Sequence, residues 1–394
     1  MSRPTTTTRA GQRPRRRRLA PALAAVLALA TLAACGGGGG GDANAAPENP
    51  IVEGEAPTYY PAEYSQIIEA SKTEGGELVI YSNTDQENWA PIFRDFQKKY
   101  PWVEKISASN LDSDEVFQRV LSEQATGSSP ADVVVSNAAQ AWADYAGGSE
   151  GRLMAYSSPE VAQLPEFATL LPNVYTMSTD PLTIAYNTAL VEQAPTGIAS
   201  LAEIVAKDPE KFRDKITTRD VNGAFGFTVS HAFTEANPDA WSSLEQLLPL
   251  ARPETSSGTQ TEKILAGEYL AGFFISGAPA YPVVENSGGL FEVTFLDDGT
   301  VVLPRGIGIT PEAPHANTAK LFVAFVLSSE GQRAVAEGGL TSYREDVTAA
   351  EGLHTYQEIV DEVGEENVIF AGYELVPEPD VAEFVSRWDG LLAK

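Results

Sequence analysis

The sequence contains one cysteine and three histidines, and its 27 lysines and arginines are outnumbered by 54 acidic residues. A single cysteine excludes an intramolecular disulfide and a zinc site built from several cysteines. The formal net charge of −27 argues against a nucleic-acid-binding protein, because contacts to phosphates need lysine and arginine. Hydrophobic residues make up 43% of the 394 residues. That is enough for a sizeable core, and the length fits two or three domains or one two-lobed unit.

The basic residues are unevenly distributed along the chain. The first 34 residues hold seven arginines and no acidic residue, whereas the chain from Cys35 onward holds the other 20 basic and all 54 acidic residues, a balance of −34. Four consecutive arginines, Arg15 to Arg18, precede an uncharged apolar run from Leu19 to Ala34. This order is typical of a secretory signal peptide, and the run is shorter than the ~20 residues of a transmembrane helix.

The predicted signal, residues 1–34, ends in Leu32-Ala33-Ala34-Cys35, which resembles a bacterial lipobox. The resemblance implies cleavage before Cys35 and a diacylglyceryl group on its sulfur, and two acyl chains anchor a protein firmly in a membrane. The glycine run 36–41 follows, so we expect residues 35–60 to form a flexible tether, with structure beginning near Pro61. We therefore predict an exported protein held by lipid on the outer face of the cytoplasmic membrane. An ordinary signal peptide with a chance cysteine is the alternative.

Strands and helices alternate along the rest of the chain. Trp89, Ile92 and Phe96 recur at helical spacing and predict one buried helix face, while the apolar run 133–135 predicts a buried strand. The predicted elements are helices over 62–76, 88–101 and 112–127; strands over 78–81, 102–109 and 131–136; helix, loop and strand over 200–218; a helix over 238–251; helix then strand over 256–277; a strand over 301–309; and a long helix or helix pair over 313–337. Such alternation predicts an α/β fold with a mainly parallel sheet covered by helices.

Three stretches of this pattern resemble one protein family. They read EASKTEGGELVIYSNT (69–84), ADVVVSNAAQAWADYAGGSEGRL (131–153) and, the most specific, APHANTAKLFVAFVLSSEGQ (313–332), which is followed by LTSYREDV (340–347). Together they are similar to the bacterial extracellular solute-binding proteins that feed ABC importers, and most similar to the branch that binds ferric iron and small anions. The match extends from about Glu69 to Val347.

The resemblance implies the two-lobed, α/β type II periplasmic-binding-protein fold, in which crossover strands form a hinge and the ligand lies in the cleft between the lobes. The expected boundaries are crossovers near 173–187 and 300–309, lobe 1 at 61–176 and 304–345, and lobe 2 at 177–303 and 346–394. The family also implies a binding protein, with no enzyme activity and no cofactor. Its expected partners are a small-molecule ligand and an ABC permease with its ATPase, to which a monomer delivers the ligand.

Polar loops follow several of the predicted strands. Ligands of open α/β sheets bind beyond the carboxyl ends of the strands, where helix N-termini present backbone N–H groups that favour anions. Small polar residues, glycines and one arginine stand there after four strands. They are Ser82, Asn83 and Thr84; Ser136 and Asn137; Thr218, Arg219, Asn222 and Gly223; and Ser276 and Gly277. Any one of them could equally serve a turn or a helix cap, but four such loops together predict a ligand site.

Arg219 is the most informative of these residues. Basic side chains are scarce after residue 34, and an arginine in this loop could hold a carboxylate or a phosphate through two hydrogen bonds. The alternative is a surface ion pair with the adjacent Asp220. Arg305 and Arg344 are expected near the hinge or on the surface.

The candidate ligand loops depart from the pattern of the iron-binding members. Those members carry adjacent tyrosines in the second lobe, and commonly a His or Glu from the first, because ferric iron favours oxygen ligands. Here the corresponding stretch from Gly272 to Gly277 contains two phenylalanines, and the pair Tyr59-Tyr60 lies in the predicted tether and is read as incidental. We therefore predict that the ligand is a small organic or phosphorus-containing anion or a metal chelate, with ferric iron held by atypical ligands as the alternative.

Two other functions are compatible with the sequence. The abundant acidic residues could supply the acid and base of a secreted hydrolase, but the sequence has no G-x-S-x-G elbow, no H-E-x-x-H motif and no cysteine beyond residue 35. His315 is interpreted as structural, and His231 and His354 are isolated, so no metal ligand is predicted among them. A binding lipoprotein that reports to a sensor would share every feature of one that serves a permease.

Overall fold

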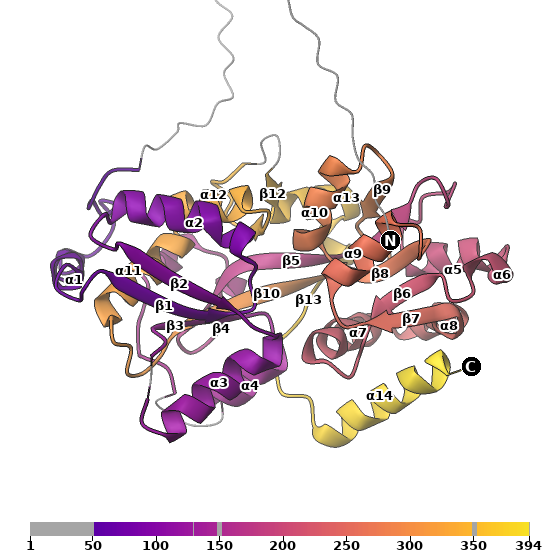
Figure 1. Ribbon diagram of the computed structural model, residues 1–394, viewed down its shortest axis with the longest axis horizontal. Coiled ribbons are helices and arrows are strands. Elements are labelled where there is room, and N and C mark those ends of the chain that lie inside the picture. The colour runs from indigo at the N-terminus through magenta and orange to yellow at the C-terminus, as the bar shows by residue number, and fades with distance from the viewer. Residues whose placement is uncertain (1–50, 129, 148–151, 349–352, 394) are drawn as a thin grey trace, which may run out of the picture. The chain divides into compact units, whose positions relative to one another are not determined.

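The computed structural model describes residues 51–394 apart from 129, 148–151, 349–352 and 394 (Figure 1). The predicted signal, the predicted lipidation site Cys35 and the tether up to residue 50 lie outside the described residues. Within the described part of the chain, the helices are all too short or too polar to cross a membrane.

Lobe 1 is built around the first three strands of the chain. Its strands are β1 (Glu77–Ser82), β2 (Lys105–Asn110) and β3 (Val133–Ser136), and its helices are α1 (Tyr64–Ser71), α2 (Gln86–Lys99), α3 (Ser113–Ala125), α4 (Ala139–Gly147), α11 (Ala316–Leu327) and α12 (Ser329–Glu337). β1 pairs in parallel with both β2 and β3. The predicted helix pair over 313–337 is thus observed, because Ser328 ends α11 and its hydroxyl caps α12 by accepting from the Gly331 N–H.

The apolar sequence of β3 follows from helices on both faces of the sheet. Val133 and Val135 belong to a core that they share with α1, α2, α11 and α12, whereas Val134 points to the opposite face and packs with α3 and α4. Successive side chains of a strand alternate between the two faces, so a strand covered on both sides must be apolar at each position. All three valines are fully buried.

Lobe 2 repeats this plan with a second group of strands. Its strands are β6 (Ile216–Arg219), β7 (Ala251–Glu254), β8 (Ala271–Ser276) and β9 (Phe291–Thr294), and its helices are α5 (Ile198–Ala206), α6 (Pro209–Phe212), α7 (Ala224–Ala236), α8 (Trp241–Leu247), α9 (Ser257–Leu265), α10 (Gly277–Asn286) and α14 (Glu378–Leu392). β6 pairs in parallel with β7 and β8. The largest apolar cluster of the described chain fills this lobe and includes Phe233, Phe273 and Trp388.

Two long strands connect the lobes, as Figure 1 shows. They are β5 (Val174–Asn187) and β10 (Thr300–Ile309), which pair antiparallel in the strand order β2-β1-β3-β10-β5-β8-β6-β7. On β5, Met177 lies in the lobe 1 core and Ile184 in the lobe 2 core; on β10, Ile307 and Leu303 make the same division. Each strand therefore enters both cores, and the crossover strands expected near 173–187 and 300–309 are present.

The pairing of the two crossover strands is irregular at one point. The register shifts between Arg305 and Gly306, which is the mark of a β-bulge and changes the direction of a side chain. The Tyr373 hydroxyl holds this bulge, since it accepts from the Gly306 N–H at 3.0 Å and donates to the Pro304 carbonyl at 2.7 Å. A Cβ atom at residue 306 would lie 2.6 Å from Trp142 Nε1, so the tryptophan leaves room only for glycine.

The C-terminal part of the chain also contacts both lobes. Its elements are β11 (Thr341–Ser342), β12 (His354–Thr355), α13 (Tyr356–Val363) and β13 (Val368–Phe370), followed by α14. The short strand β4 (Thr169–Leu171) lies earlier in the chain and pairs with β5. Ala371 packs in the lobe 2 core, and Tyr373 packs with α3 and α4 of lobe 1. The Gln140 side chain of α4 donates to the Glu374 carbonyl and accepts from the Val376 N–H. The chain thus touches lobe 1 again before α14 returns to lobe 2.

The sequence interpretation of Tyr59 and Tyr60 was wrong in one respect. These residues were placed in the tether and read as incidental, but both hydroxyls donate to Glu160 Oε1, at 2.7 and 2.5 Å. Glu160 is fully buried and also accepts from Arg344 Nη1 at 2.8 Å. A buried carboxylate needs such partners, because desolvation without them is costly. Ordered packing therefore begins before Pro61.

The start of α11 depends on a carboxylate from another helix region. Glu74, just after α1, accepts from the backbone N–H groups of Asn317 and Thr318 and from both of their side chains. Burial alone would raise the pKa of Glu74, but these four hydrogen bonds outweigh it and lower the pKa below its usual value. His315, expected to be structural, precedes the helix and contacts Asp132 through Nδ1 at 3.0 Å.

We predict that Glu74→Gln destabilises the protein by about 1 kcal/mol at pH 7, because a charged acceptor at a helix N-terminus is replaced by a neutral one. Since the folded-state pKa is depressed, this stabilisation is present above the ordinary carboxyl pKa and is lost as pH falls through the folded value. Urea unfolding at pH 7 and at pH 3 should show a larger difference between the variant and the wild type at the higher pH. The exposed Glu104→Gln is the matched control, and an equal loss at both pH values would contradict the assignment.

Candidate functional site

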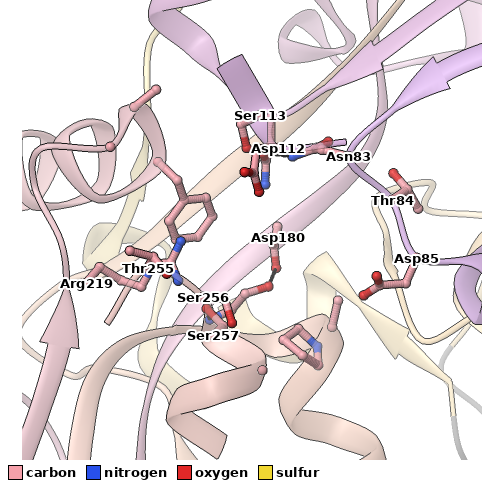
Figure 2. Close-up of a pocket in the computed structure, with 18 of the residues that line it drawn as sticks. Asn83, Thr84, Asp85, Asp112, Ser113, Asp180, Arg219, Thr255, Ser256 and Ser257 are labelled. Atoms are coloured by element: carbon pink, nitrogen blue, oxygen red, sulfur yellow. Dashed lines mark hydrogen bonds between the residues drawn. The ribbon is translucent and has the colours of Figure 1, made fainter. Parts of the chain in front are cut away.

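A cleft of about 670 Å³ lies between the lobes, within the size range of small-molecule sites. Lobe 1 lines it with residues from the loops after β1, β2 and β3, and lobe 2 lines it with the starts of α7, α9 and α10. The crossover strands contribute Asp180 from β5 and Arg305 from β10. Figure 2 shows the polar side chains of the two lobes converging on this space, with Asp180 near the middle.

The lobe 1 wall is held together by the Asn83 side chain. Its Nδ2 donates to Asn137 Oδ1 at 2.6 Å and to Ser113 Oγ at 2.8 Å, and its Oδ1 accepts from Arg305 Nη1 at 2.8 Å. The same guanidinium nitrogen donates to Thr84 Oγ1 at 3.0 Å. Three strand-end loops of lobe 1 are therefore fixed to one another and to a crossover strand.

Arg219 is the cationic side chain of the lobe 2 wall. It ends β6, it is 8% exposed, and its guanidinium lies over the Phe225 ring at 4.5 Å, a favourable cation–π geometry. Its Nε and Nη1 atoms have no hydrogen-bond partner among the described residues. Burial lowers the pKa of Arg219 to about 10, although Asp180 and Asp220 act in the opposite direction. The group is therefore charged at neutral pH and has donors available for an anion.

The floor of the cleft carries an opposed pair of buried charges. Asp180 is 2% exposed and Arg305 is 5% exposed, and Arg305 Nη2 lies 3.7 Å from Asp180 Oδ2. Burial raises the pKa of Asp180, against the effects of Arg305 and Ser276. Burial also lowers the pKa of Arg305. Ser276 Oγ donates to Asp180 Oδ1 at 2.6 Å, so the pair joins the start of α10 in lobe 2 to the Asn83 loop in lobe 1.

Five helices of the described chain begin at the cleft. The first residues or N-caps of α2, α3, α7, α9 and α10 are all part of its lining. Among the described residues, the side chains of Asp85, Asp112 and Ser276, the N-caps of α2, α3 and α10, form no capping hydrogen bond. The N-cap of α7 is Gly223, which has no side chain, whereas Ser256 caps α9. Each helix N-terminus carries a partial positive charge and unpaired N–H groups. Their convergence makes this region favourable for an anion.

The structure brings together some of the residues that the sequence indicated and not others. Those in the cleft lining are Asn83, Thr84, Asn137, Arg219, Gly223 and Ser276. Those outside the lining are Ser82, Ser136, Thr218, Asn222 and Gly277. Ser82 and Ser136 are fully buried and serve neighbouring backbone, with their hydroxyls donating to the carbonyls of Ser109 and Ser113. Thr218 is also buried, one residue before Arg219 on β6.

Asn222 and Gly277 are outside the lining for different reasons. Asn222 is exposed, and its amide groups hydrogen-bond Asp220 Oδ1 at 2.9 Å, which closes the turn before α7. Gly277 is covered by Tyr281, since a Cβ atom there would lie 2.7 Å from the tyrosine ring and hydroxyl. The alternative role as a turn residue therefore applies to Asn222, whereas Gly277 is kept out of the lining by packing against Tyr281.

Several lining residues were not anticipated from the sequence. Arg305 was expected near the hinge or on the surface, and it lies on the hinge but faces the cleft. The others are Asp85, Asn88, Asn110 to Ser113, Asp180, Asp220, Ala224 to Gly226, Thr255 to Gly258, Ala278 and Pro279. Thr255 follows β7, a strand that the sequence does not predict, since the predicted helix ends at residue 251, where β7 begins. Asp180 lies within β5, where no loop signals a site.

Comparison with known proteins identifies the family. Residues 92–359 match the model of the bacterial extracellular solute-binding proteins, which is more than half of the chain. The chain belongs to this family. No curated protein sequence matches it.

Solved structures share the fold of this solute-binding protein. A substrate-binding protein of an ABC transporter from Agrobacterium tumefaciens superimposes with a TM-score of 0.72 at 20% identity, covering 82% of this chain and 95% of the other. AfuA from Actinobacillus pleuropneumoniae, with fructose-6-phosphate bound, gives 0.62 at 21% identity over 80% and 98%. Iron-bound HitA from Pseudomonas aeruginosa gives 0.58 at 19% identity over 80% and 98%. The expected type II periplasmic-binding fold is confirmed.

The start of α7 gives a test of how tightly the cleft wall is built. A Cβ atom at Gly226 would lie 2.0 Å from the Asp220 carbonyl oxygen, whereas one at Gly223 would lie 3.7 Å from the same atom. We predict that Gly226→Ala destabilises the solute-binding protein by about 1–3 kcal/mol, because the backbone must move to relieve the overlap. Gly223→Ala should be tolerated. Denaturant unfolding of the two variants compares them directly, and equal midpoints would argue against this packing.

Proposed function

We propose that this chain is the substrate-binding protein of an ABC importer and that it captures a small anion in the cleft between its lobes. The observation that carries this proposal is the convergence of five helix N-termini on a cleft whose lobe 2 wall holds Arg219. This buried cation has two donor atoms, Nε and Nη1, that no described residue pairs with. Both features stabilise negative charge. The crossover strands β5 and β10 would bend as the hinge when the lobes close on the ligand.

The comparisons support the importer role at the level of fold and family. The Agrobacterium protein is described as part of an ABC transporter, and the two others were solved with fructose-6-phosphate and with iron. At about 20% identity these ligands do not transfer to the present chain. We propose that the partners of this protein are a permease and its ATPase, and that it is a monomeric binding protein and not an enzyme.

The cleft favours an organic or phosphorus-containing anion, or a metal chelate, over bare ferric iron. Within the described residues, no group of three or more His, Cys, Asp or Glu side chains comes together as a metal site. The stretch from Gly272 to Gly277 holds buried Phe273 and Phe274 in place of a tyrosine pair. Phenylalanine offers iron no oxygen ligand, whereas Arg219 and the helix N-termini suit an anionic group.

We also propose the lobe boundaries and the mode of attachment. Lobe 1 would comprise 61–176 and 304–345, and lobe 2 would comprise 177–303 and 346–394; the packing of α14 with α7 and α8 supports the last assignment. The basic and apolar segment 1–34 and the lipobox support export and lipidation of Cys35. The ordered contacts of Tyr59 and Tyr60 shorten the proposed tether at its C-terminal end.

Native mass spectrometry of protein purified without refolding is the first test of this function. A co-purifying small anion should be detected and identified by its mass. Added back at 100 times its Kd, it should stabilise the protein by ~2.7 kcal/mol in a thermal shift assay, and small-angle scattering should show a smaller radius of gyration. Cells in which the gene is disrupted should lose uptake of the same anion. Absence of any ligand-dependent stabilisation across anion and metabolite panels would refute the proposal.

Arg219→Ala should weaken binding of the co-purified anion by more than tenfold, because the variant removes the charged donors of the lobe 2 wall. The affinity of Arg219→Lys should lie between those of the wild type and Arg219→Ala, since an ammonium retains the charge but not the planar pair of donors. Calorimetry measures both. Arg252→Ala, an exposed arginine of the same lobe that pairs with Asp214, is the matched control. Unchanged affinity in Arg219→Ala would remove this residue from the site.

Cys35→Ala should release the protein from the membrane. If the cysteine sulfur carries the diacylglyceryl group, the variant lacks both acyl chains of the anchor. Cell fractionation and labelling with a radioactive fatty acid should find label and protein together in membranes for the wild type and neither there for the variant. A variant that remains membrane-bound would show that another element holds the protein.

A further inference from the structure

The second oxygen of Asp180 is a buried hydrogen-bond acceptor that finds no partner in the described part of the chain. Oδ1 accepts from Ser276 Oγ at 2.6 Å, but Oδ2 has no hydrogen-bond partner among the described residues. The nearest cationic atom, Arg305 Nη2, lies 3.7 Å from Oδ2, which is beyond hydrogen-bond distance. Buried carboxylate oxygens are normally satisfied, and Asp180 lines the ligand cleft. The missing donor is therefore expected to come from the ligand.

Arg305 is not free to neutralise Asp180 more closely. Its Nη1 is committed to lobe 1 through hydrogen bonds to Asn83 Oδ1 and Thr84 Oγ1, and the bulge at Gly306 fixes the strand from which it extends. Arg219, on the other wall, has no hydrogen-bond partner for Nε or Nη1 within the residues that the structure describes. The cleft thus presents two complementary sets of unused groups: donors of a cation at Arg219 and an anionic acceptor at Asp180.

We propose that the substrate is a small anion that also carries a protonated amine. Its anionic group would bind to Arg219 and the N–H groups at the start of α7, and its ammonium group would donate to Asp180 Oδ2. This inference rests on the proposed function and narrows its substrate class. One ligand molecule would carry both groups, so that closure of the hinge would give hydrogen-bond partners to Arg219 and to Asp180 Oδ2 at the same time.

The charge of the cleft favours an amine over an unsubstituted anion. Besides Asp180, the lining includes Asp85 and Asp112, which are exposed, and Asp220, which is partly buried. Four aspartates against Arg219 and Arg305 leave the side chains of the lining with a balance of −2. An anion with no cationic group would bring further negative charge towards Asp180, whereas an ammonium converts that repulsion into attraction. A hydroxyl could donate to Oδ2 but would not offset its charge.

Matched pairs of probes test this inference. Each pair shares an anionic group and differs in the amine: phosphoethanolamine with ethyl phosphate, taurine with ethanesulfonate, and γ-aminobutyrate with butyrate. A further probe, glycerol phosphate, carries hydroxyl groups in place of the amine. Calorimetry with ligand-free protein should show at least tenfold tighter binding of the amine-bearing member of the pair whose anionic group fits best. Equal affinity within a pair, tighter binding of glycerol phosphate, or no binding of any amine-bearing probe would overturn the inference.

Asp180→Asn separates charge recognition from a structural effect. The amide is close in size to the carboxylate and keeps an oxygen acceptor for Ser276. It should reduce the preference for the amine-bearing probe from at least tenfold to within about twofold, while the amine-free partner binds as well or better. A purely structural residue would weaken both members equally, which would contradict the role. Asp239→Asn, an exposed aspartate outside the cleft, is the control and should preserve the preference.

The two proposals fail in distinguishable ways. If a co-purified anion without an amine stabilises the protein and closes the lobes, the binding function stands and the amine inference is wrong. If an amine-bearing anion co-purifies, both are supported, and Asp180→Asn should weaken that ligand by at least tenfold. If no anion of either kind stabilises the protein, the binding function itself is wrong, and the inference that rests on it falls with it.

Discussion

The antiparallel pairing of β5 with β10 is the constraint on which the rest of this structure depends. Each strand carries apolar residues into both cores, so neither lobe is complete without them. The same strands place Asp180 and Arg305 at the floor of the cleft. The bulge at Arg305 and Gly306, held by Tyr373 and shaped by Trp142, gives Arg305 its direction towards the Asn83 loop. The same strand pair therefore forms the hinge, contributes to both cores and carries the two charged residues at the floor of the cleft.

The cleft shows how a strongly acidic protein can present a site that suits an anion. The net charge of −27 describes the whole chain, and exposed carboxylates are well solvated and screened. What a ligand meets at close range is the start of five helices, two buried arginines and four aspartates, of which only Asp180 is fully enclosed. These groups act in a partly desolvated space, where short-range interactions are stronger than across the solvated surface. Local geometry thus outweighs overall composition.

Much of the fold could be predicted from the sequence, because helical spacing and apolar runs report directly on burial. The loops after β1, β3, β6 and β8 were predicted in this way, and of their residues Asn83, Asn137, Arg219 and Ser276 line the cleft. Ser82, Ser136 and Thr218 lie outside the cleft lining, because the sequence pattern alone does not tell which face the last residues of a strand present. Asp180 could not be found, since it lies inside a crossover strand and its role comes from pairing with a segment 125 residues away, at Arg305.

The helix N-termini at the cleft have a consequence for how such a protein can change over generations. They attract anions through the peptide backbone, which no side-chain substitution removes while the helices persist. By contrast, a single substitution can replace Asp180, Arg219 or either of the serines at the starts of α9 and α10. Mutational drift around the cleft would therefore alter which anion fits long before it abolished the preference for anions, so that one backbone can be passed from ligand to ligand.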